Sequence, residues 1–550
     1  MVQNGGLAHL SNSLHPRDQN ESATESEPLP IAVRVYPEGG KQKSEASPWQ
    51  CPDAMLVFDT ETRIDQTQRL TFGSFRFLVA GRCLEEGLFY GADLPDKDYQ
   101  TLERYVASHP AGTVESGVQK LAFLSRREFI DKIFHDAYKA QFLLVAFNFP
   151  FDISRLAWKF GTARRQPFTG GFSLELWSYP ANGQEHTNRF RPSVRIKQID
   201  SKRALKGFAG RKGADDEDRI PDDSETGEPE EGYTFRGHFL DLRTLAFALT
   251  DRGHTLESAC KAFGVEHGKQ RVKRHGVVTA KYIDYNRRDV LATSELAIKL
   301  LEEYSRHPIN LQVTKAYSPA SIGKAYLHAM GIPPVLQRQP DFPKEYLGYA
   351  TTAFFGGRTS AHIRKTTVPV VYTDFLSMYP TVNSLMDLWR FVTAKEIKVV
   401  QGCQAEIEQF LQKLTPDDLF NPVTWKSLTA FAQIIPDGDI LPSRGEYNPD
   451  TKDWQVAVNY LHADRNNSEN QALWFSLPDI VASVILTNRL PRITSAFRLV
   501  PTGELESLQP TKLLNEISVD PKNEDFFRVV IERRDPLPKF VPNGTGNSRC

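Results

Sequence analysis

The sequence contains few cysteines and no long hydrophobic run. Its five cysteines are scattered over 550 residues, and no two of them are spaced as C-x-x-C. This argues against a disulfide framework and against a structural zinc site, and it suits a reducing cytosol. No apolar run approaches the ~20 residues that a membrane helix needs, and the N-terminus lacks the pattern of a signal peptide. We therefore expect a soluble, cytoplasmic protein that does not enter a membrane.

A surplus of charge of either sign is also missing. Lys and Arg number 67 and Asp and Glu number 68, which gives a formal net charge of −1 at pH 7. Global charge therefore says nothing for or against nucleic acid, and any DNA-binding surface must be a local patch. Basic residues do cluster at 195–212 and at 269–275. These clusters could follow a phosphate backbone, or they could be ordinary solvated surface.

Large apolar residues are scarce in two polar tracts. Residues 1–50 are rich in Ser, Glu, Asn, Pro and Gly, and we predict that they are mostly disordered. Residues 213–232 are acidic and are predicted to form an exposed loop. The folded part of the chain is therefore expected to begin at about residue 51.

Between residues 51 and 305, predicted strands and helices alternate. Short apolar or alternating runs predict strands at 54–59, 70–80, 88–90, 142–147 and 238–241. A capping-box pattern at Ser125–Glu128 precedes a helix with an apolar face, and further helices are expected at 242–249 and 281–304. Strands that alternate with helices indicate an α/β layer fold.

After about residue 305 the pattern changes. We expect a helix at 317–330, a strand at 368–374 and a helix that begins near Pro380. The stretch 396–470 is irregular, and the stretch 477–499 predicts two helices separated at Pro491.

An acidic pair lies at the end of the first predicted strand. In Asp59-Thr-Glu61 the two carboxylates are at positions i and i+2, so they point to one face of the strand. Two such groups repel each other unless a cation lies between them, and hard carboxylate oxygens suit Mg²⁺ or Mn²⁺. Taken alone, this pattern is more often a solvated strand terminus.

Two further acidic segments follow. Asn148-Phe-Pro-Phe-Asp152 comes after the strand 142–147 and would open a helix. Asp152 by itself fits a helix N-cap, but Asn148 and Phe151 could hold a single-stranded nucleotide by hydrogen bonding and stacking. Tyr285-Asn-Arg-Arg-Asp289 lies on the helix 281–304, where residues i and i+4 share a face. Alone, that pair fits a partly buried amphipathic face.

Taken together, the three segments supply four carboxylates and one phenol. Such a set can bind two metal ions about 3.5–4 Å apart, with a water on one ion attacking a phosphodiester and the other ion stabilising the leaving oxygen. Tyr285 would orient the attacking water. The combination predicts a two-metal nuclease site formed by Asp59, Glu61, Asp152 and Asp289.

These segments resemble the three exonuclease motifs of family B DNA polymerases, and more broadly the DEDDy nucleases on a ribonuclease H-like fold. The resemblance implies a 3′–5′ exonuclease that removes single nucleotides with two Mg²⁺ or Mn²⁺ ions. Asp241, in Phe-Leu-Asp-Leu, is similar to a further acidic residue of that fold, although capping at a strand end explains it equally well.

A later segment, Tyr372-Thr-Asp-Phe-Leu-Ser-Met-Tyr-Pro380, resembles motif A of the same polymerases, with Met378 in place of the usual Leu. The resemblance implies that Asp374 binds catalytic Mg²⁺, that the backbone near Ser377 cradles an incoming dNTP, and that Tyr379 stacks beneath its sugar. Without the resemblance, the segment is a strand, a turn and a helix.

Upstream of it, Phe354-Phe-Gly-Gly-Arg358 resembles the Y-x-G-G type motif that contacts template in this family. Gly356 and Gly357 would permit close backbone approach to a phosphate, and Arg358 would supply charge. Alone, the segment could be an ordinary turn.

The rest of the polymerase pattern is missing. No K-x-x-x-N-S-x-Y-G type helix and no Y-G-D-T-D type motif follows Pro380, and Asp437-Gly-Asp439 is predicted to be a turn. One palm aspartate cannot anchor two ions in the geometry that phosphoryl transfer requires. We therefore expect nuclease activity without templated synthesis, as in a polymerase that is truncated or is completed by a second chain.

The expected fold class is α/β, with a ribonuclease H-like exonuclease domain followed by a partial α+β polymerase palm. The expected segments are the exonuclease domain at 51–305, a linker and palm start at 306–395, and a partial palm or insertion with a helical region approaching the fingers at 396–550. The resemblance implies DNA as the partner, as a single-stranded 3′ end or a primer-template, with a dNTP as a ligand of an active palm. Two alternatives stay open, namely a free-standing nuclease with a vestigial palm and a non-catalytic DNA-binding or assembly subunit.

Overall fold

The computed structural model describes most of the chain between residues 49 and 533. The gaps within this range are 114–119, 165–166, 189, 210–234, 269–275, 357–362, 364–365, 372, 374, 376, 449–452 and 464–470. Nearly all of the segment predicted to be disordered, the acidic loop at 213–232 and the basic cluster at 269–275 therefore lie outside the described residues.

The chain divides into two compact units. The larger unit consists of Glu38–Pro340, Phe375–Ile397 and Pro501–Cys550. The smaller unit consists of Met1–Pro37, Asp341–Asp374 and Lys398–Val500. The main segment of the smaller unit is thus inserted between two segments of the larger one.

The chain leaves and rejoins the larger unit at neighbouring places. Lys395 donates its backbone N–H to the carbonyl oxygen of Gly503 at 3.4 Å, and Thr502 Oγ1 donates to the carbonyl oxygen of Glu396 at 3.4 Å. The outgoing and returning segments therefore run side by side within the larger unit.

The larger unit is built on a six-stranded sheet. Its strands are β1 (Ala54–Thr62), β2 (Leu70–Val79), β3 (Arg82–Tyr90), β4 (Ala122–Ser125), β5 (Leu143–Ala146) and β12 (His238–Asp241), in the order β12-β5-β1-β2-β3-β4. β1, β2 and β3 are antiparallel neighbours, whereas β5 runs parallel to β1, and β12 parallel to β5. The five predicted strands are confirmed, and the mixed sheet with its helices confirms the α/β class.

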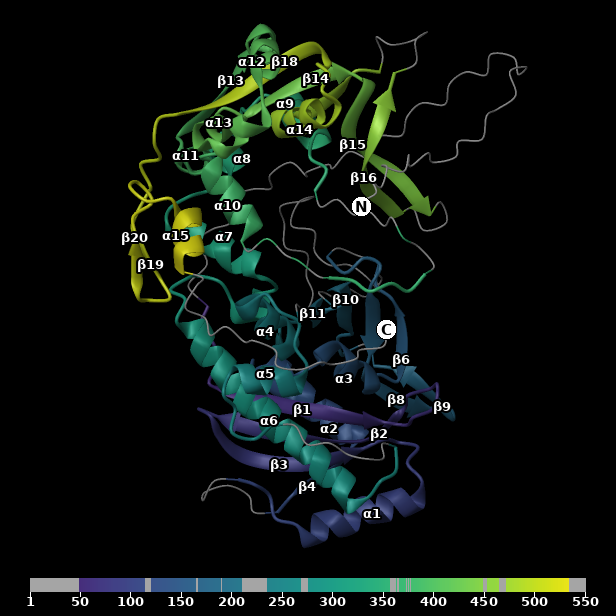
Figure 1. Ribbon diagram of the computed structural model, residues 1–550. Helices are drawn as coiled ribbons and strands as arrows, with labels where there is room; N and C mark the ends of the chain where they lie inside the picture. The colour runs from purple at the N-terminus through teal and green to yellow at the C-terminus, as the bar shows by residue number, and fades with distance from the viewer. Residues whose placement is uncertain are drawn as a thin grey trace, which may run out of the picture. The chain divides into compact units, whose positions relative to one another are not determined.

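Helices cover both faces of this sheet (Figure 1). The helices of this part of the chain are α1 (Asp96–Ser108), α2 (Arg126–Ile133), α3 (Phe149–Arg155), α4 (Leu242–Thr250), α5 (Leu256–Ala262), α6 (Ala280–Ser305) and α7 (Pro319–Ala329), and α7 packs against α4. The predicted capping box is confirmed, because Ser125 Oγ accepts from Glu128 N at 3.2 Å while Glu128 Oε2 accepts from Ser125 N at 2.7 Å. The helix after it continues as the π-helix η1 (Phe134–Lys139), which was not predicted.

Alternate residues of β1 enter two separate cores. Leu56 and Phe58 point to the face covered by α2 and α3, where the ring of Phe129 packs on Phe58 with centroids 5.7 Å apart. Met55 and Val57 point to the opposite face, which α4 and α6 cover. Since side chains alternate along a strand, Asp59 and Glu61 continue the face that looks toward α6.

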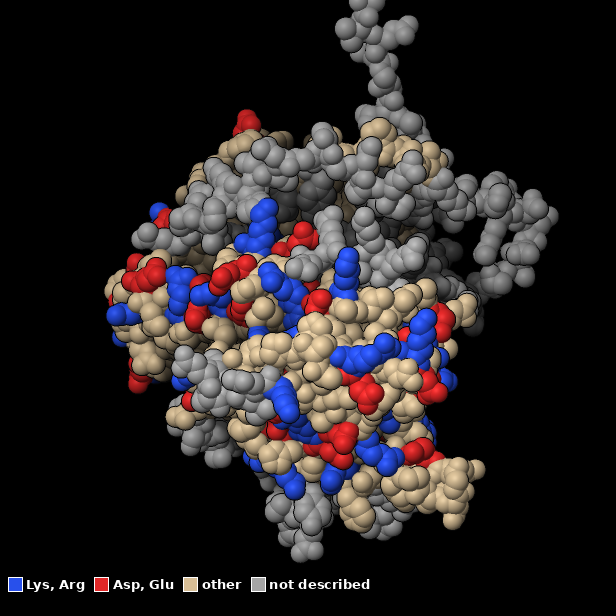
Figure 2. All heavy atoms as spheres, turned by 90° about the horizontal axis from the view of Figure 1, so that it is seen from below, with Lys and Arg blue, Asp and Glu red and all other residues tan. Residues whose placement is uncertain are grey.

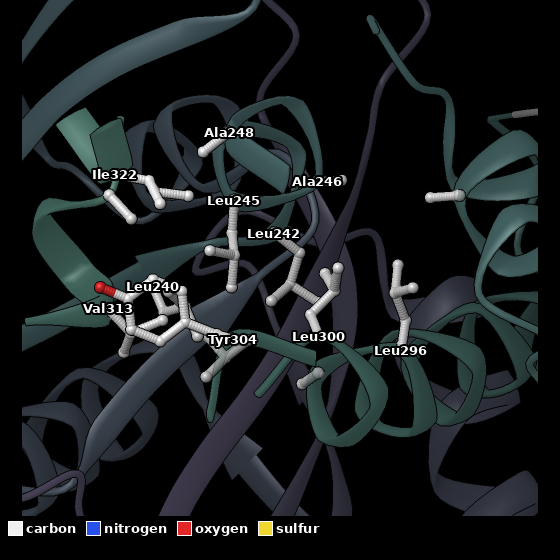
Figure 3. Packing of buried hydrophobic residues seen from close by; sticks show 14 of the residues in the cluster. Leu240, Leu242, Leu245, Ala246, Ala248, Leu296, Leu300, Tyr304, Val313 and Ile322 are labelled. Carbon is white, nitrogen blue, oxygen red and sulfur yellow. The ribbon is translucent and has the colours of Figure 1, made fainter. Parts of the chain in front are cut away.

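The core between α4 and α6 fixes the position of α6. Figure 3 shows Leu296 and Leu300 of α6 directed toward Leu242 and Leu245 of α4. These side chains are all less than 2 % exposed. Burying a leucine side chain contributes roughly 1.5–3 kcal/mol, so this packing holds the helix against the sheet.

A second, four-stranded sheet in the larger unit carries the described part of the basic cluster 195–212, which ends at residue 209. Its strands are β6 (Lys159–Thr162), β7 (Phe172–Glu175), β10 (Val194–Asp200) and β11 (Arg203–Phe208), next to the hairpin of β8 (Ser178–Ala181) and β9 (Gln184–Thr187). Arg195 is only 1 % exposed, and Arg203 pairs with Asp200 at 2.6 Å. Lys202 and Lys206 lie over aromatic rings at 4.9 Å and 5.6 Å. These contacts favour a structural role for the described part of the cluster.

The charged side chains on one face of the molecule are mixed in sign. Figure 2 views the molecule from below relative to Figure 1 and shows Lys and Arg interspersed with Asp and Glu over the described residues. This agrees with the near-zero net charge of the whole chain.

The smaller unit holds most of a four-stranded sheet in the order β13-β18-β14-β17 and a separate hairpin. The strands are β13 (Glu396–Gln401), β14 (Ala430–Ile435), β17 (Leu473–Ser476) and β18 (Arg492–Thr502), and the hairpin is β15 (Asp437–Asn448) with β16 (Asp453–His462). The helical elements of this part of the chain are α9 (Lys344–Thr352), α12 (Gln404–Lys413), η3 (Pro416–Phe420), α13 (Pro422–Lys426) and α14 (Leu477–Thr487).

Several predictions for this part of the chain are wrong. The stretch 396–470 is regular in its described residues, and the second predicted helix after Pro491 is the strand β18. Asp437-Gly-Asp439 is not a free turn but an irregularity at the start of β15, where Asp439 Oδ2 accepts from Asp437 N at 2.9 Å and Gly438 has φ of +85°. Pairing with strands far away in the sequence determines these conformations, and local patterns do not encode it.

The remaining helical and strand elements of the larger unit are short. They are η2 (Val313–Lys315), α8 (Val335–Arg338), α10 (Met378–Leu385), α11 (Trp389–Thr393), β19 (Thr511–Leu513), β20 (Ile517–Val519) and α15 (Phe526–Arg533). The predicted helix after the motif A segment is confirmed as α10, with Pro380 as its third residue.

The predicted strand at 368–374 is wrong for its described residues, which belong to no strand or helix. Val370 and Val371 are 83 % and 86 % exposed, so the segment gains no strand partner among the described residues. No helix in the described part of the chain has the length and apolarity needed to span a bilayer.

Candidate active site

The register of β1 against β2 places the first acidic pair opposite residues that face α6. Asp59 lies across from Ser74, and Glu61 lies across from Phe72. Directly opposite side chains on neighbouring strands have their Cβ atoms about 4.5–5.5 Å apart. The register shifts between Glu61 and Thr62, so the regular strand pair ends immediately after the two carboxylates.

One face of α6 points at this pair. Tyr282, Tyr285, Asn286 and Asp289 occur at i, i+3, i+4 and i+7, which form one stripe of a helix. All four side chains are buried. Asn286 Nδ2 donates to Asp59 Oδ2 at 2.7 Å and lies 3.4 Å from Glu61 Oε1, and the hydroxyl of Tyr282 donates to Glu61 Oε2. The first and third acidic segments are thereby brought together across more than 220 residues of sequence.

Asp152 joins from the first turn of α3. Thr60, which stands between the two acidic residues of β1, donates to Asp152 Oδ1 from its backbone N–H at 3.2 Å and from its hydroxyl at 2.8 Å. The side chain of Asp152 is 2 % exposed. Burial raises the pKa of the Asp152 carboxyl to about 7, with smaller contributions from the charges of Glu61 and Asp241, while the hydrogen bonds from Thr60 act in the opposite direction.

Tyr285 and Asp289 complete the group. Tyr285 is hydrogen-bonded to Asp289, and burial together with the charges of Asp289, Glu61 and Asp59 raises the pKa of the phenol. Asp289 itself is 4 % exposed. All four predicted carboxylates and the predicted tyrosine therefore belong to one electrostatically coupled cluster.

Asp241 has a structural role at the N-terminus of α4. Its carboxylate accepts hydrogen bonds from Arg243 N at 3.1 Å and from Thr244 Oγ1 at 3.0 Å. Burial raises the pKa of this carboxyl, and the charge of Lys206 opposes that effect. These contacts support the capping interpretation of Asp241. The negative charge of Asp241 also contributes to the raised pKa of Asp152.

The two predicted nucleotide contacts flank Asp152. Asn148 precedes α3, and its side chain makes no capping hydrogen bond to that helix. The ring of Phe151 is partly exposed and has the guanidinium of Arg155 at 4.6 Å from its centroid. Arg155 also donates to the carbonyl oxygen of Gln68 at 3.1 Å, in the loop that follows β1. The ring of Phe151 and the guanidinium of Arg155 therefore pack together on the helix that carries Asp152, and the charge of Asp152 acts on Arg155.

The chemistry of these ligands fits a hard divalent cation, because every candidate ligand is a carboxylate oxygen. In the described residues, however, no three His, Cys, Asp or Glu side chains are arranged so that they could hold a metal ion. Asp152 accepts a hydrogen bond from Thr60, while Asp59 and Glu61 accept hydrogen bonds from Asn286 and Tyr282. Carboxylates that repel one another take neutral protein donors instead.

The structure describes only some of the candidate polymerase residues. Asp374, Gly357 and Arg358 lie outside the described residues. Gly356 has φ of +72° and belongs to the smaller unit, whereas Ser377 and Tyr379 belong to the larger one. Ser377 is 8 % exposed with φ of +54°, and Tyr379 is 70 % exposed.

Comparisons with known proteins can now be set beside this geometry. No protein-family model matches the sequence, and no curated protein matches it. Among solved structures, "Phi29 DNA polymerase complexed with single-stranded DNA" is similar. The TM-score is 0.32 with 11 % sequence identity, over 82 % of this chain and 61 % of that chain. The matched part thus spans less than two thirds of that polymerase, and at this TM-score the likeness carries no argument about function.

Four residues of the cluster were missed in the sequence, namely Thr60, Ser74, Tyr282 and Asn286. The helical spacing of Tyr282, Tyr285, Asn286 and Asp289 is a signal that could have indicated two of them. Ser74 could not have been found without the register of β1 against β2, which sequence patterns alone do not determine.

Proposed function

We propose that the larger unit is a metal-dependent 3′–5′ exonuclease acting on single-stranded DNA, in a chain of the family B DNA polymerase type. The observation that carries this proposal is the cluster of Asp59, Glu61, Asp152, Tyr285 and Asp289, which come from three distant segments. A site for two divalent cations requires several carboxylates close together, and buried acidic groups with raised pKa values are often found at functional sites.

The sheet supports this proposal. Three antiparallel strands, β1 to β3, are followed by β5 and β12 on the other side of β1, both parallel to it. This order supports a ribonuclease H-like fold for the domain. Asp59 and Glu61 lie on the central strand β1, and Asp152 follows its neighbour β5, so the proposed site lies where the carboxyl ends of two adjacent parallel strands meet.

In the proposed mechanism, Asp59, Glu61, Asp152 and Asp289 would hold two Mg²⁺ or Mn²⁺ ions. Ions bound there supply a nucleophilic water and stabilise the leaving oxygen of the phosphodiester. Asn148, Phe151 and Arg155 would hold the 3′-terminal nucleotide, because an amide can bind a base edge, a ring can stack on it and a guanidinium can pair with phosphate.

Tyr285 acts in this scheme as a hydrogen-bond donor rather than a base. Its raised pKa keeps the phenol protonated at neutral pH, so that it can orient a water beside Asp289.

Changing Tyr285 to phenylalanine is expected to lower kcat for degradation by roughly 10–100-fold and to leave KM for the oligonucleotide nearly unchanged, because one orienting hydrogen bond is lost. Single-turnover and steady-state assays on a 5′-labelled oligonucleotide measure both constants. Tyr304→Phe is the matched control, since that buried tyrosine of α6 donates to Leu311 O at 2.7 Å, away from the carboxylates. An equal loss in both variants would contradict the assigned role.

The purified chain is expected to shorten a 5′-labelled single-stranded oligonucleotide one nucleotide at a time from its 3′ end, with Mg²⁺ or Mn²⁺ and not in EDTA. Absence of any degradation with either ion would overturn the proposed function. A primer-template and dNTPs added to the same preparation test the palm, and extension is not expected, because the sequence offers Asp374 without a second palm motif.

A further inference from the structure

We propose that Asn286 is a positioning residue that holds Asp59 and Glu61 beside each other and thereby helps these two carboxylates to bind a divalent cation, with Ser74 fixing the orientation of its amide. This inference rests on the proposed exonuclease function and extends it to residues that contact the proposed cation ligands directly or through Asn286.

The contacts of Asn286 connect two strands and a helix. Its side chain is 0 % exposed, and Nδ2 lies 2.7 Å from Asp59 Oδ2 and 3.4 Å from Glu61 Oε1. Its Oδ1 accepts a hydrogen bond of 2.6 Å from Ser74 Oγ, which is 1 % exposed. One neutral amide therefore bridges the two carboxylates from β1 and is itself held by β2.

The chemistry of the neighbours decides which way this amide points. Ionised carboxylates only accept hydrogen bonds, so the NH₂ group must face Asp59 and Glu61. The amide oxygen then faces Ser74, whose hydroxyl can donate. Removing the serine hydroxyl would leave the amide oxygen buried without this donor, which weakens the preference of the amide for this orientation.

Glu61 is held from both sides. Asn286 lies at Oε1, and the hydroxyl of Tyr282 donates to Oε2. The ring of Tyr282 packs edge-on against Phe72, which lies opposite Glu61 in the sheet, with centroids 5.5 Å apart. The orientation of the carboxylate is thus set by two donors, one of which is fixed by ring packing.

This arrangement lowers the cost of bringing two like charges together. Asp59 and Glu61 share a face of β1 and repel each other, and the two N–H groups of a single amide offset that repulsion. A cation then meets two carboxylates that already lie close together. Removing a residue that orients a metal ligand typically weakens metal binding by about 10–100-fold.

A purely structural role for Asn286 would have a different signature. In that case Asn286→Ala would lower the melting temperature without changing the affinity of the folded protein for the cation. The distinction therefore requires a direct measurement of Mn²⁺ binding well below the melting temperature, beside the activity.

The experiment compares the full chain with Asn286→Ala, Ser74→Ala and Tyr282→Phe. Ser294→Ala is the matched control, because that buried hydroxyl of α6 donates to Leu291 O at 2.7 Å. Mn²⁺ binding is followed by electron paramagnetic resonance of the free ion, and the Mn²⁺ concentration for half-maximal degradation is measured in parallel.

Asn286→Ala is expected to weaken Mn²⁺ binding by about 10–100-fold and to raise the half-maximal Mn²⁺ concentration by the same factor. Ser74→Ala and Tyr282→Phe should shift both values in the same direction by smaller factors, and Ser294→Ala should shift neither. KM for the oligonucleotide at saturating Mn²⁺ should not change.

Two results would overturn the inference, and they differ from a failure of the proposed function. Unchanged Mn²⁺ affinity in folded Asn286→Ala would overturn it while the nuclease stands. If Asn286→Ala does not fold, unchanged affinity in both Ser74→Ala and Tyr282→Phe would overturn it equally. A wild-type chain that neither binds Mn²⁺ nor degrades DNA would remove the proposed function, and this inference with it.

Discussion

Replacing Asp59 and Glu61 together with alanine is expected to abolish degradation of single-stranded DNA, with a loss of at least roughly 10³-fold in rate. Both carboxylates of β1 would be removed, so cation binding in the proposed site would lose half of its ligands. A loss of about 4 kcal/mol in transition-state stabilisation corresponds to this factor. The measurement is the rate of 3′-terminal release at saturating Mg²⁺ or Mn²⁺, together with binding of the same oligonucleotide.

The matched control removes two carboxylates that lie away from the cluster. Glu103 of α1 and Glu302 of α6 are exposed residues of the same unit, so Glu103→Ala with Glu302→Ala changes the net charge equally. Loss of degradation with retained binding in the β1 variant supports a nuclease. If the wild type binds DNA without degrading it, and the β1 variant binds equally well, the chain is a non-catalytic binding or assembly subunit instead.

Asp152→Asn is expected to stabilise the ion-free protein at pH 8 while removing its nuclease activity. The folded-state pKa of Asp152 is raised from 3.8 to about 7. Between these values the unfolded chain has lost the proton and the folded protein keeps it. The unfolded state therefore binds fewer protons, and stability falls as the pH rises from about 4 to about 7. A neutral asparagine avoids this loss and can still accept from Thr60 through its side-chain oxygen.

The gain at pH 8 is expected to be at most about 4 kcal/mol, since one pKa unit corresponds to ~1.4 kcal/mol, and it should nearly vanish at pH 4. Thermal unfolding in EDTA at the two pH values measures it. Asp131→Asn, an exposed aspartate of α2, is the control and should show no such difference. A lower melting temperature for Asp152→Asn at pH 8 would show that the carboxylate is not strained by burial.

Five strands of the main sheet in the larger unit and several of its helices could be predicted because local patterns mark them, whereas the strands β6 to β11 were not predicted. The runs at β1, β5 and β12 are short and apolar, and the Ser125–Glu128 pair signals a helix start that the contacts confirm. The stretch after Pro491 shows the limit. Ile493, Ala496 and Phe497 have helical spacing, yet they are buried in the strand β18, whose register against β14 shifts between Gln433 and Ile434. Pairing with β14 decides the conformation, and that pairing is non-local.

Some residues of the candidate site could likewise be predicted from the sequence, and others could not. Its carboxylates could be named from the sequence because each follows a strand or lies on a periodic helix. The residues that hold them, Thr60, Ser74 and Asn286, depend on the register of β1 against β2 and on the depth at which α6 packs. The structure gives less support to the candidate palm residues. Asp374 lies outside the described residues, and its described neighbours do not form the expected strand.

The side-by-side connections at Lys395–Gly503 and Glu396–Thr502 have a consequence for how this chain tolerates change. Residues 398–500 begin and end at nearly one point of the larger unit, so a short turn could replace them without moving either end. The entropic cost of bringing the two ends of such an inserted segment together grows only with the logarithm of its length. The segment can therefore be lengthened, shortened or exchanged with little cost to the sheet that carries the carboxylates. Changes in this segment can therefore alter the surface of the smaller unit while the proposed nuclease site is kept.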